Sequence, residues 1–299
     1  MSRAGWLNAL LATAVVALGA FFYFRPAQDA AVEYPLSALK SQEARSLRIE
    51  RAGAAPIVLD RKQDVWFISA PFAARADASR VQQLLAIVEA RAAHRLPAGD
   101  RGRFGLEQPE ARIIVDGQPF SFGMVNNITR EQYVMSGDAV YAVHPRFGAA
   151  LPLNAVQMAS YQLFGADESP VRIALRDFAV EQREGKWTLA PHSGELSQDD
   201  LLRWVDEWRL ASALRVEPRS AARSQDEIKV QLKNAGEFTL GVLSREPELV
   251  LARSDEKLQY RFRGELAKRL LSPPGAADKR TAEHAERNKN KNGTADKRS

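Results

Sequence analysis

The side chains that most often catalyse reactions or bind metals are few in this chain and far apart in sequence. Its 299 residues include no cysteine and four histidines, His94, His144, His192 and His284. No two histidines have the i, i+4 spacing that places two imidazoles on one helix face. The lack of cysteine excludes thiolate zinc sites, iron–sulfur clusters, disulfides and cysteine nucleophiles. We therefore predict no catalytic residue, no metal and no cofactor, and interpret the histidines as surface or helix-end residues.

Two polar pairs, Asn126-Asn127 and Asp199-Asp200, are the clearest remaining candidates for chemistry. The first lies in an expected hairpin loop, and the second opens a predicted helix, where acidic side chains favour the helix dipole. The sequence contains no P-loop, dinucleotide-binding or nucleophile-elbow motif. A hydrolase site assembled from scattered residues, such as paired carboxylates or a Ser–His contact, stays open as the least favoured reading.

Aromatic residues offer a different kind of candidate, a surface on which a ligand stacks. Trp66 and Trp187 would suit sugars or peptides, but they occupy equivalent strand positions, which favours a role in the core. The segment Phe104–Pro109 is the best functional candidate because loops carry function more often than core elements do. A packed turn, in which Phe104 and Leu106 cover the edge of the domain, is the interpretation that we favour, because apolar residues outnumber reactive ones.

The elements that would position these residues form an internal duplication with a spacing of about 120 residues. Residues 57–71 and 178–191 each have the pattern of a β-hairpin that ends at a proline. An amphipathic helix follows each hairpin, with Asp77 or Ser79 as the cap in the first copy and Ser197 in the second. The apolar stripes are Val81, Leu84, Leu85 and Val88, and Leu201, Trp204, Val205 and Trp208. Both helices are expected to end alike, at His94–Pro97 and at Leu214–Pro218.

A run of strands closes each copy, separated by turn signals such as Asp116-Gly117. A helix is expected after each run, near Asn154–Phe164 and at Gly264–Leu271. The predicted strands are 111–115, 120–124, 132–136 and 139–144 in the first copy, and 227–232, 237–242, 248–252 and 258–263 in the second.

The fold class predicted from these patterns is α+β, with two tandem units of β-hairpin, helix, antiparallel meander and helix. The units are expected at residues 45–165 and 166–273, and a linker at 25–44 precedes them. The last segment, 274–299, is predicted to be a disordered basic tail because residues 275–299 contain no large apolar side chain.

The N-terminal residues predict a membrane anchor. Trp6–Phe24 carries no charge and would span roughly 28 Å as a helix, close to the thickness of a bilayer core. Its aromatic end, Phe21–Phe24, fits a membrane interface better than a signal-peptide cleavage site, so an uncleaved signal anchor is favoured. Residues 1–5 would then form a cytoplasmic stub, and the bulk of the chain would lie in the periplasm, held at the inner membrane.

The distribution of charge argues against nucleic acid as a partner. The chain has a formal net charge of +5, but residues 275–299 carry seven Lys/Arg and four Asp/Glu, which accounts for +3 of it. A nucleic-acid-binding protein normally gathers its basic residues on a folded face. We therefore predict that nucleic acid is not a partner.

Four motifs of the first unit are typical of one known family. They are Trp66 before Pro71, Ala76-Asp77, Phe104-Gly105-Leu106 with Pro109, and Tyr133-Val134 followed by Val140-Tyr141. Through these motifs the first unit resembles the domain-of-unknown-function 4340 family of bacterial envelope proteins over about residues 45–145, with a weaker similarity over 170–265. The phenylalanine at 104 stands where tyrosine is usual, and the second unit lacks the Gly-Leu-x-x-Pro element. The resemblance implies an N-terminal anchor, an extracytoplasmic α+β domain and, for some relatives, genes near gliding-type ABC export systems; it implies no catalytic residues.

These observations favour a non-enzymatic accessory or scaffold protein of the cell envelope that binds a protein partner, such as a transporter component. A module that binds a glycan, lipid or peptide in a groove between the two units is the alternative. A cleft between the units would support that alternative, and a junction filled by side chains would count against it.

Overall fold

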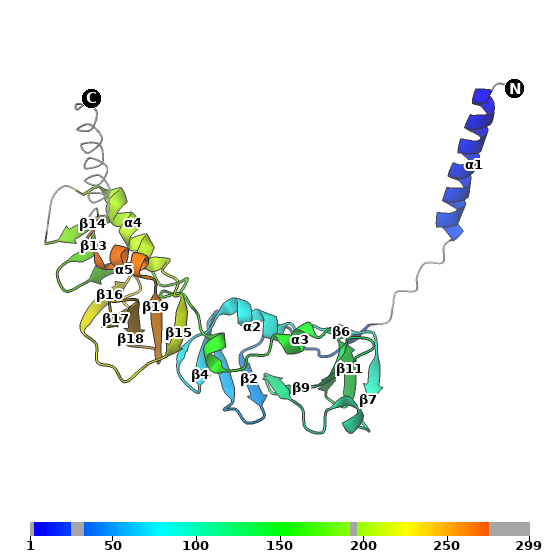
Figure 1. Ribbon diagram of the computed structural model, residues 1–299, viewed down its shortest axis with the longest axis horizontal. Helices are drawn as coiled ribbons and strands as arrows, with labels where there is room; N and C mark the ends of the chain where they lie inside the picture. Colours follow the sequence, from blue (N-terminus) through cyan, green and yellow to red (C-terminus); the bar gives the residue numbers. More distant parts are fainter. Residues whose placement is uncertain (1–2, 25–32, 192–195, 275–299) are drawn as a thin grey trace, which may run out of the picture.

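The structure is a computed structural model that describes residues 3–24, 33–191 and 196–274. Two large antiparallel sheets dominate it and lie one after the other along the longest axis of the molecule (Figure 1). Residues 25–32 of the predicted linker, His192, His284 and the predicted tail from residue 275 lie outside the described residues.

The membrane anchor predicted at residues 6–24 is contradicted. These residues belong to helix α1, Arg3–Phe24. Among the residues that the structure describes, however, no helix combines the length and the apolar character required to cross a bilayer. The predictions of a signal anchor and of a single-pass inner-membrane location with a periplasmic bulk, which rested on that span, are therefore wrong.

The first large sheet has nine strands, and its order is β5-β4-β3-β2-β8-β9-β10-β11-β7. Every neighbouring pair in it is antiparallel. The strands are β2 (Ser46–Arg51), β3 (Ile57–Lys62), β4 (Val65–Ala70), β5 (Ala74–Arg75), β7 (Arg95–Pro97), β8 (Ala111–Val115), β9 (Gln118–Val125), β10 (Gln132–Ser136) and β11 (Ala139–Val143).

The second large sheet has eight strands in the order β14-β13-β12-β16-β17-β18-β19-β15. Strand by strand this is the order of the first sheet without β5, and both hairpins that open the sheets end at a cis-proline, Pro71 or Pro191. The strands are β12 (Pro170–Ala174), β13 (Ala179–Arg183), β14 (Lys186–Ala190), β15 (Arg215–Pro218), β16 (Asp226–Leu232), β17 (Glu237–Ser244), β18 (Leu249–Arg253) and β19 (Leu258–Phe262).

Short helices lie along one side of each large sheet (Figure 1). In α4, the apolar stripe Leu201, Trp204, Val205 and Trp208 is buried against the core, because side chains at these spacings share one helix face. The remaining elements are the two-stranded sheet of β1 (Tyr34–Pro35) and β6 (Arg91–Ala92), the helices α2 (Ala78–Leu85), α3 (Arg146–Ala149), α4 (Gln198–Arg209) and α5 (Gly264–Leu271), and the 3₁₀ turns η1 (Gly102–Phe104) and η2 (Ala155–Met158).

The predicted α+β class is also wrong, because the described chain is mainly β-structure: strands hold 39% of the residues and helices 21%. Part of the difference lies in the helix expected near Asn154–Phe164, of which only the turn η2 forms. Beyond η2, Ala159 forms a β-bridge with Ala76, and Gln162 forms one with Ser212. The backbone of these residues is therefore hydrogen-bonded in β-bridges and not in a helix. The segments before Pro97 and Pro218, expected to end helices, form the edge strands β7 and β15.

Many single elements were predicted correctly. Strands 111–115 and 132–136 and helix Gly264–Leu271 have the expected bounds, and the other meander strands agree within two residues at either end. Asp77 and Ser197 cap α2 and α4 through their side chains, as expected from their types and positions. The strands β2 and β12, which join each hairpin to its meander, were missed.

The outer edge of β14 is covered at Trp187 by a side chain rather than by a strand. The Gln198 amide accepts a hydrogen bond from Trp187 N and donates one to Trp187 O, each at 2.8 Å. This pair of bonds copies the pattern that a neighbouring strand would make. Gln198 therefore satisfies backbone groups that an edge strand would otherwise present to solvent.

Candidate functional site at the junction of the two sheets

The segment that connects the two sheets is hydrogen-bonded to both of them. Ser160 N donates to Arg75 O of β5 at 3.0 Å, and Leu163 N donates to Ala211 O at 2.9 Å. Ala213 N in turn donates to Tyr161 O at 2.8 Å. Backbone hydrogen bonds therefore hold the connecting segment on both sides and fix the position of the charged side chains that meet there.

Arg75 reaches across this junction from the first sheet to the second. Its side chain is 8% exposed, and Nε donates to Glu256 Oε1 at 2.7 Å, a residue 181 positions away in the turn between β18 and β19. Its Nη2 donates to the carbonyl oxygens of Gln162 and Leu163 at 2.9 and 3.0 Å. Arg75 therefore joins β5, the connecting segment and the second sheet through one guanidinium.

Arg253, at the end of β18, is the second buried guanidinium and is 1% exposed. Nη1 and Nη2 donate to the two carboxylate oxygens of Glu168, both at 2.8 Å, which is the bidentate geometry of a strong ion pair. Arg253 also binds Asp255 through Nε and Nη2, at 2.9 and 2.7 Å, and lies 3.7 Å from the ring centroid of Phe238. Carboxylates and an aromatic ring thus stabilise this buried charge.

Tyr260 completes the cluster, because its hydroxyl donates to Glu256 Oε2. Burial raises the pKa of Tyr260 above its usual range, and the charge of Glu256 raises it further, so the phenol stays protonated and donates. We refer to Arg75, Glu168, Arg253, Asp255, Glu256 and Tyr260 as the junction network.

Two carboxylates of the junction network, Glu168 and Asp255, are held in their charged form. Burial alone would raise the pKa of Glu168, but the hydrogen bonds and charge of Arg253 and the charge of Arg75 outweigh it and lower that pKa. The pKa of Asp255 is lowered in the same way, with Arg253 again outweighing burial. Glu168 and Asp255 therefore act as ion-pair partners and not as carboxyl groups poised to exchange a proton near neutral pH.

A groove opens beside the junction network, on the face of the first sheet opposite α2. Its cavity volume is about 440 Å³. Asp60, Phe67 and Arg75 are direct cross-strand neighbours on β3, β4 and β5, so they form one row across this face. This junction groove is lined by Asp60, Lys62, Val65, Phe67, Ile68, Ser69, Ala73, Ala74, Arg75, Asp167, Glu168, Asp255 and Glu256.

The groove has an apolar floor, a half-buried aromatic ring and an excess of negative charge, since five carboxylates face two cations. Asp60 and Asp167 make no ion pair and no side-chain hydrogen bond to any residue that the structure describes. Lys62 places its ammonium 5.6 Å from the centroid of the Phe67 ring. The junction itself is filled by side chains, but the groove beside it offers space lined from both sheets.

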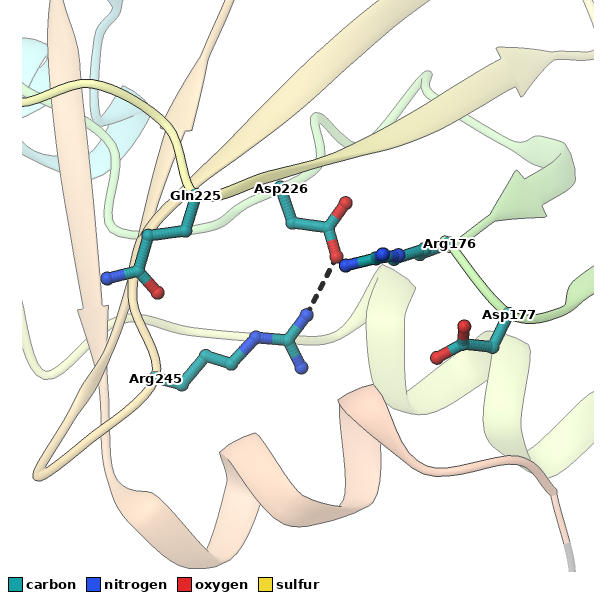
Figure 2. Close-up of a pocket in the computed structure, with 5 residues that line it drawn as sticks. All are labelled: Arg176, Asp177, Gln225, Asp226 and Arg245. Atoms are coloured by element: carbon teal, nitrogen blue, oxygen red, sulfur yellow. Dashed lines mark hydrogen bonds and ion pairs between the residues drawn. The ribbon is translucent and has the colours of Figure 1, made fainter.

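A second pocket, of about 430 Å³, lies at one end of the second sheet (Figure 2). It is lined by Arg176, Asp177, Gln225, Asp226 and Arg245, and Arg245 Nη2 is 2.9 Å from Asp226 Oδ2. Figure 2 shows these side chains converging from the β12–β13 turn, the start of β16 and the β17–β18 turn. The lining is polar and largely exposed, without the aromatic floor that the junction groove has.

The residues singled out from the sequence have structural roles and do not come together. His94 and His144 are exposed, and His144 Nδ1 accepts a hydrogen bond from Arg146 N at 3.1 Å. Asn126 accepts from Ile128 N at 2.8 Å and so shapes its own loop, while Asp200 accepts from Ser197 at the start of α4. Within the described ranges, no three His, Asp or Glu side chains group as metal ligands.

The loop Phe104–Pro109 is a packed turn, as favoured. Phe104 and Leu106 are buried with Val140 in a small cluster separate from the main core. Gly105 has φ +68°, the left-handed conformation that glycine adopts without strain. Trp66 is 4% exposed and Trp187 packs partly buried against the main core, so both tryptophans are structural.

Sequence reasoning missed the junction network entirely. Nothing in a single sequence marks Arg253 and Glu256, on either side of the Ser254-Asp255 turn, as buried. Arginine and glutamate side chains are normally exposed, so the sequence alone predicts that Arg253 and Glu256 lie on the solvated surface. Glu256 is buried through its contact with Arg75, which lies 181 residues away in sequence. Arg253 is buried through its contact with Glu168, which lies 85 residues away.

The fold and the site define a β-protein of two similar sheets joined through a buried charged network. The family model named domain of unknown function, DUF4340, matches residues 66–229, which is more than half of the chain. The chain therefore belongs to this family, as its motifs suggested. The match runs from β4 of the first sheet into β16 of the second and so includes the connecting segment. No curated protein and no solved structure matches the chain.

Proposed function

We propose that this protein is a non-enzymatic accessory protein that binds a segment of a protein partner in the junction groove. The observation that carries the proposal is the groove itself, an apolar floor rimmed by unpaired carboxylates and walled by both sheets. A cavity of about 440 Å³ is within the usual size of ligand sites but is open along one sheet face, which suits an extended segment.

The absence of a reactive constellation among the described residues favours binding over catalysis. Glu168, Asp255 and Glu256 in the groove wall are committed to ion pairs with Arg253 and Arg75. The pKa of Glu168 is lowered, whereas a general acid or base works best with a pKa near the pH of its reaction. The two sheets, tied by Arg75 and Arg253, would present the groove in one fixed shape. Such preorganisation lowers the entropy cost of binding.

The proposal is tested by photo-crosslinking in the cells that make the protein. A photoreactive amino acid is placed at Ser69, an exposed residue of the groove, and at Ala221, an exposed residue outside it. We expect one protein to be crosslinked at Ser69 and not at Ala221, through a defined segment that mass spectrometry identifies.

Binding of the purified partner to the full-length chain then decides the case. Ala73→Trp fills the groove at an exposed lining position, and Ala221→Trp is the matched control. We expect the first variant to lose at least tenfold in affinity, about 1.4 kcal/mol, and the control to lose none. Equal binding by both variants, or turnover of a substrate by the purified chain, would refute the proposal.

A further inference from the structure

The outer face of β3, β4 and β5 arranges three different groups in one row. Asp60 is the direct cross-strand neighbour of Phe67, and Phe67 is that of Arg75. Neighbouring side chains on one sheet face lie about 5 Å apart, so a single long side chain can contact the carboxylate and the ring together. The row therefore joins an aromatic face to a carboxylate that has no ion-pair partner among the described residues.

The ring face of Phe67 already attracts a cation. Lys62 is two residues from Asp60 on β3, and its ammonium lies 5.6 Å from the ring centroid. An aromatic ring attracts a cation at this distance through its negative face. Lys62 is exposed and makes no ion pair to any described residue, so it occupies the place that an incoming cation would take.

The guanidinium of Arg75 is not available to a ligand in the groove. Its side chain is 8% exposed, and its Nη1 is buried and makes no hydrogen bond to any described residue, although Glu168 Oε2 lies 3.7 Å away. A ligand in the groove therefore meets Phe67, Asp60 and Asp167, so recognition depends on an aromatic ring and two carboxylates.

We propose that the junction groove binds an arginine or lysine side chain of the partner segment, with its stem on Phe67 and its charge facing Asp60 and Asp167. Asp60 and Asp167, the two lining carboxylates that make no ion pair to a described residue, supply the matching charge. In this arrangement the ligand displaces the ammonium of Lys62 from the ring. The inference rests on the proposed function, because it names the chemistry of the segment that the groove would hold.

The test uses the full-length chain and three blocked tripeptides that differ only in the central residue: arginine, citrulline or glutamate. Citrulline keeps the shape of arginine without its charge. Binding is followed by NMR shifts of the groove residues and by calorimetry at two salt concentrations. We expect the arginine peptide to bind at least threefold more tightly than the citrulline peptide, and to weaken with salt. Equal affinities would overturn the inference.

Single substitutions locate the interaction. Asp60→Asn should weaken the arginine peptide about threefold, as should Asp167→Asn, while Asp177→Asn in the pocket of Figure 2 should have no effect. Lys62→Gln should tighten binding of the arginine peptide, because the competing cation is gone. Weaker binding of the arginine peptide by the Lys62 variant would mean that Lys62 contributes to binding instead of competing with the ligand, which would also overturn the inference.

The result separates this inference from the proposed function. A partner segment crosslinked at Ser69 that contains no arginine or lysine would leave the groove as the binding site and reject the cationic side chain. Loss of both the crosslink and the peptide binding would reject both proposals.

Discussion

Arg75 donates two hydrogen bonds to one oxygen of Glu256, from Nε at 2.7 Å and from its backbone N at 3.2 Å. The two residues belong to different sheets, and both are buried. A side chain and its own backbone thus hold the same carboxylate, so the turn between β18 and β19 is fixed against β5 in position and in direction.

Replacing Arg75 by Ala should destabilise the chain by about 3 kcal/mol, because it leaves the buried carboxylate of Glu256 without its partner. Urea unfolding followed by fluorescence measures this change. Arg95→Ala is the matched control, since Arg95 forms a surface ion pair with Asp138 and should cost less than about 1 kcal/mol. The double variant Arg75→Leu with Glu256→Leu should be more stable than Arg75→Leu alone. The reverse order would show that Glu256 is not paired as described.

Stability should depend on pH through Glu168. Its pKa in the folded chain is lower than the ordinary value of 4.5, so its ion pair with Arg253 contributes fully above that value. The contribution is lost as the pH falls below 4.5 and through the lowered folded pKa. Unfolding free energies measured between pH 7 and pH 3 should therefore stay level near neutrality and decrease in acid. Glu168→Gln should reduce the decrease, whereas Glu110→Gln on the surface should keep the slope of the parent chain.

Two glycines in the corresponding strands β9 and β17 should respond differently to the same substitution. A Cβ on Gly123 would collide with the carbonyl oxygen of Phe104, which is backbone and cannot move alone. A Cβ on Gly241 would meet the hydroxyl of Ser224, which can rotate away. Thermal unfolding should show a cost of about 1–3 kcal/mol for Gly123→Ala and a smaller cost for Gly241→Ala. Gly99→Ala, with open space around it, should be neutral; equal costs at positions 123 and 241 would contradict the described packing.

Trp208 joins α4 to α5, and its loss should affect both helices. Its side chain is 0% exposed, and Nε1 donates to Leu270 O at 3.2 Å. Trp208→Ala should cost about 3–5 kcal/mol and should increase hydrogen exchange in α5. Leu202→Ala, on the exposed face of the same helix, should change stability by less than about 0.5 kcal/mol. Unchanged exchange in α5 would indicate that the helix is held elsewhere.

The parts of the fold that were predictable from sequence are those decided by neighbours along the chain. The caps Asp77 and Ser197, the stripe of α4 and the meander strands all follow from local patterns. Strand β5 has two residues, too few for a pattern, yet it places Arg75 in the junction. The candidate site could not be predicted from the sequence, because its burial depends on pairs such as Arg75 and Glu256. These two residues meet only when both sheets have formed.

The β-content was underestimated for a related reason. Short edge strands such as β7 and β15 contain proline and charged residues, which favour the ends of helices and turns when read locally. Their pairing with β11 and β19 is set by the tertiary fold. Tertiary context therefore converted expected helix ends into strands.

The amide of Gln198 on the edge of β14 has a consequence for how copies of the chain behave at high concentration. An open strand edge is a template on which a second molecule can add its own strand, and repeated addition leads to fibrils. Because Gln198 occupies the hydrogen-bonding groups of Trp187, a second chain would first have to displace it. The eight-stranded sheet thus ends in a side chain that discourages self-assembly.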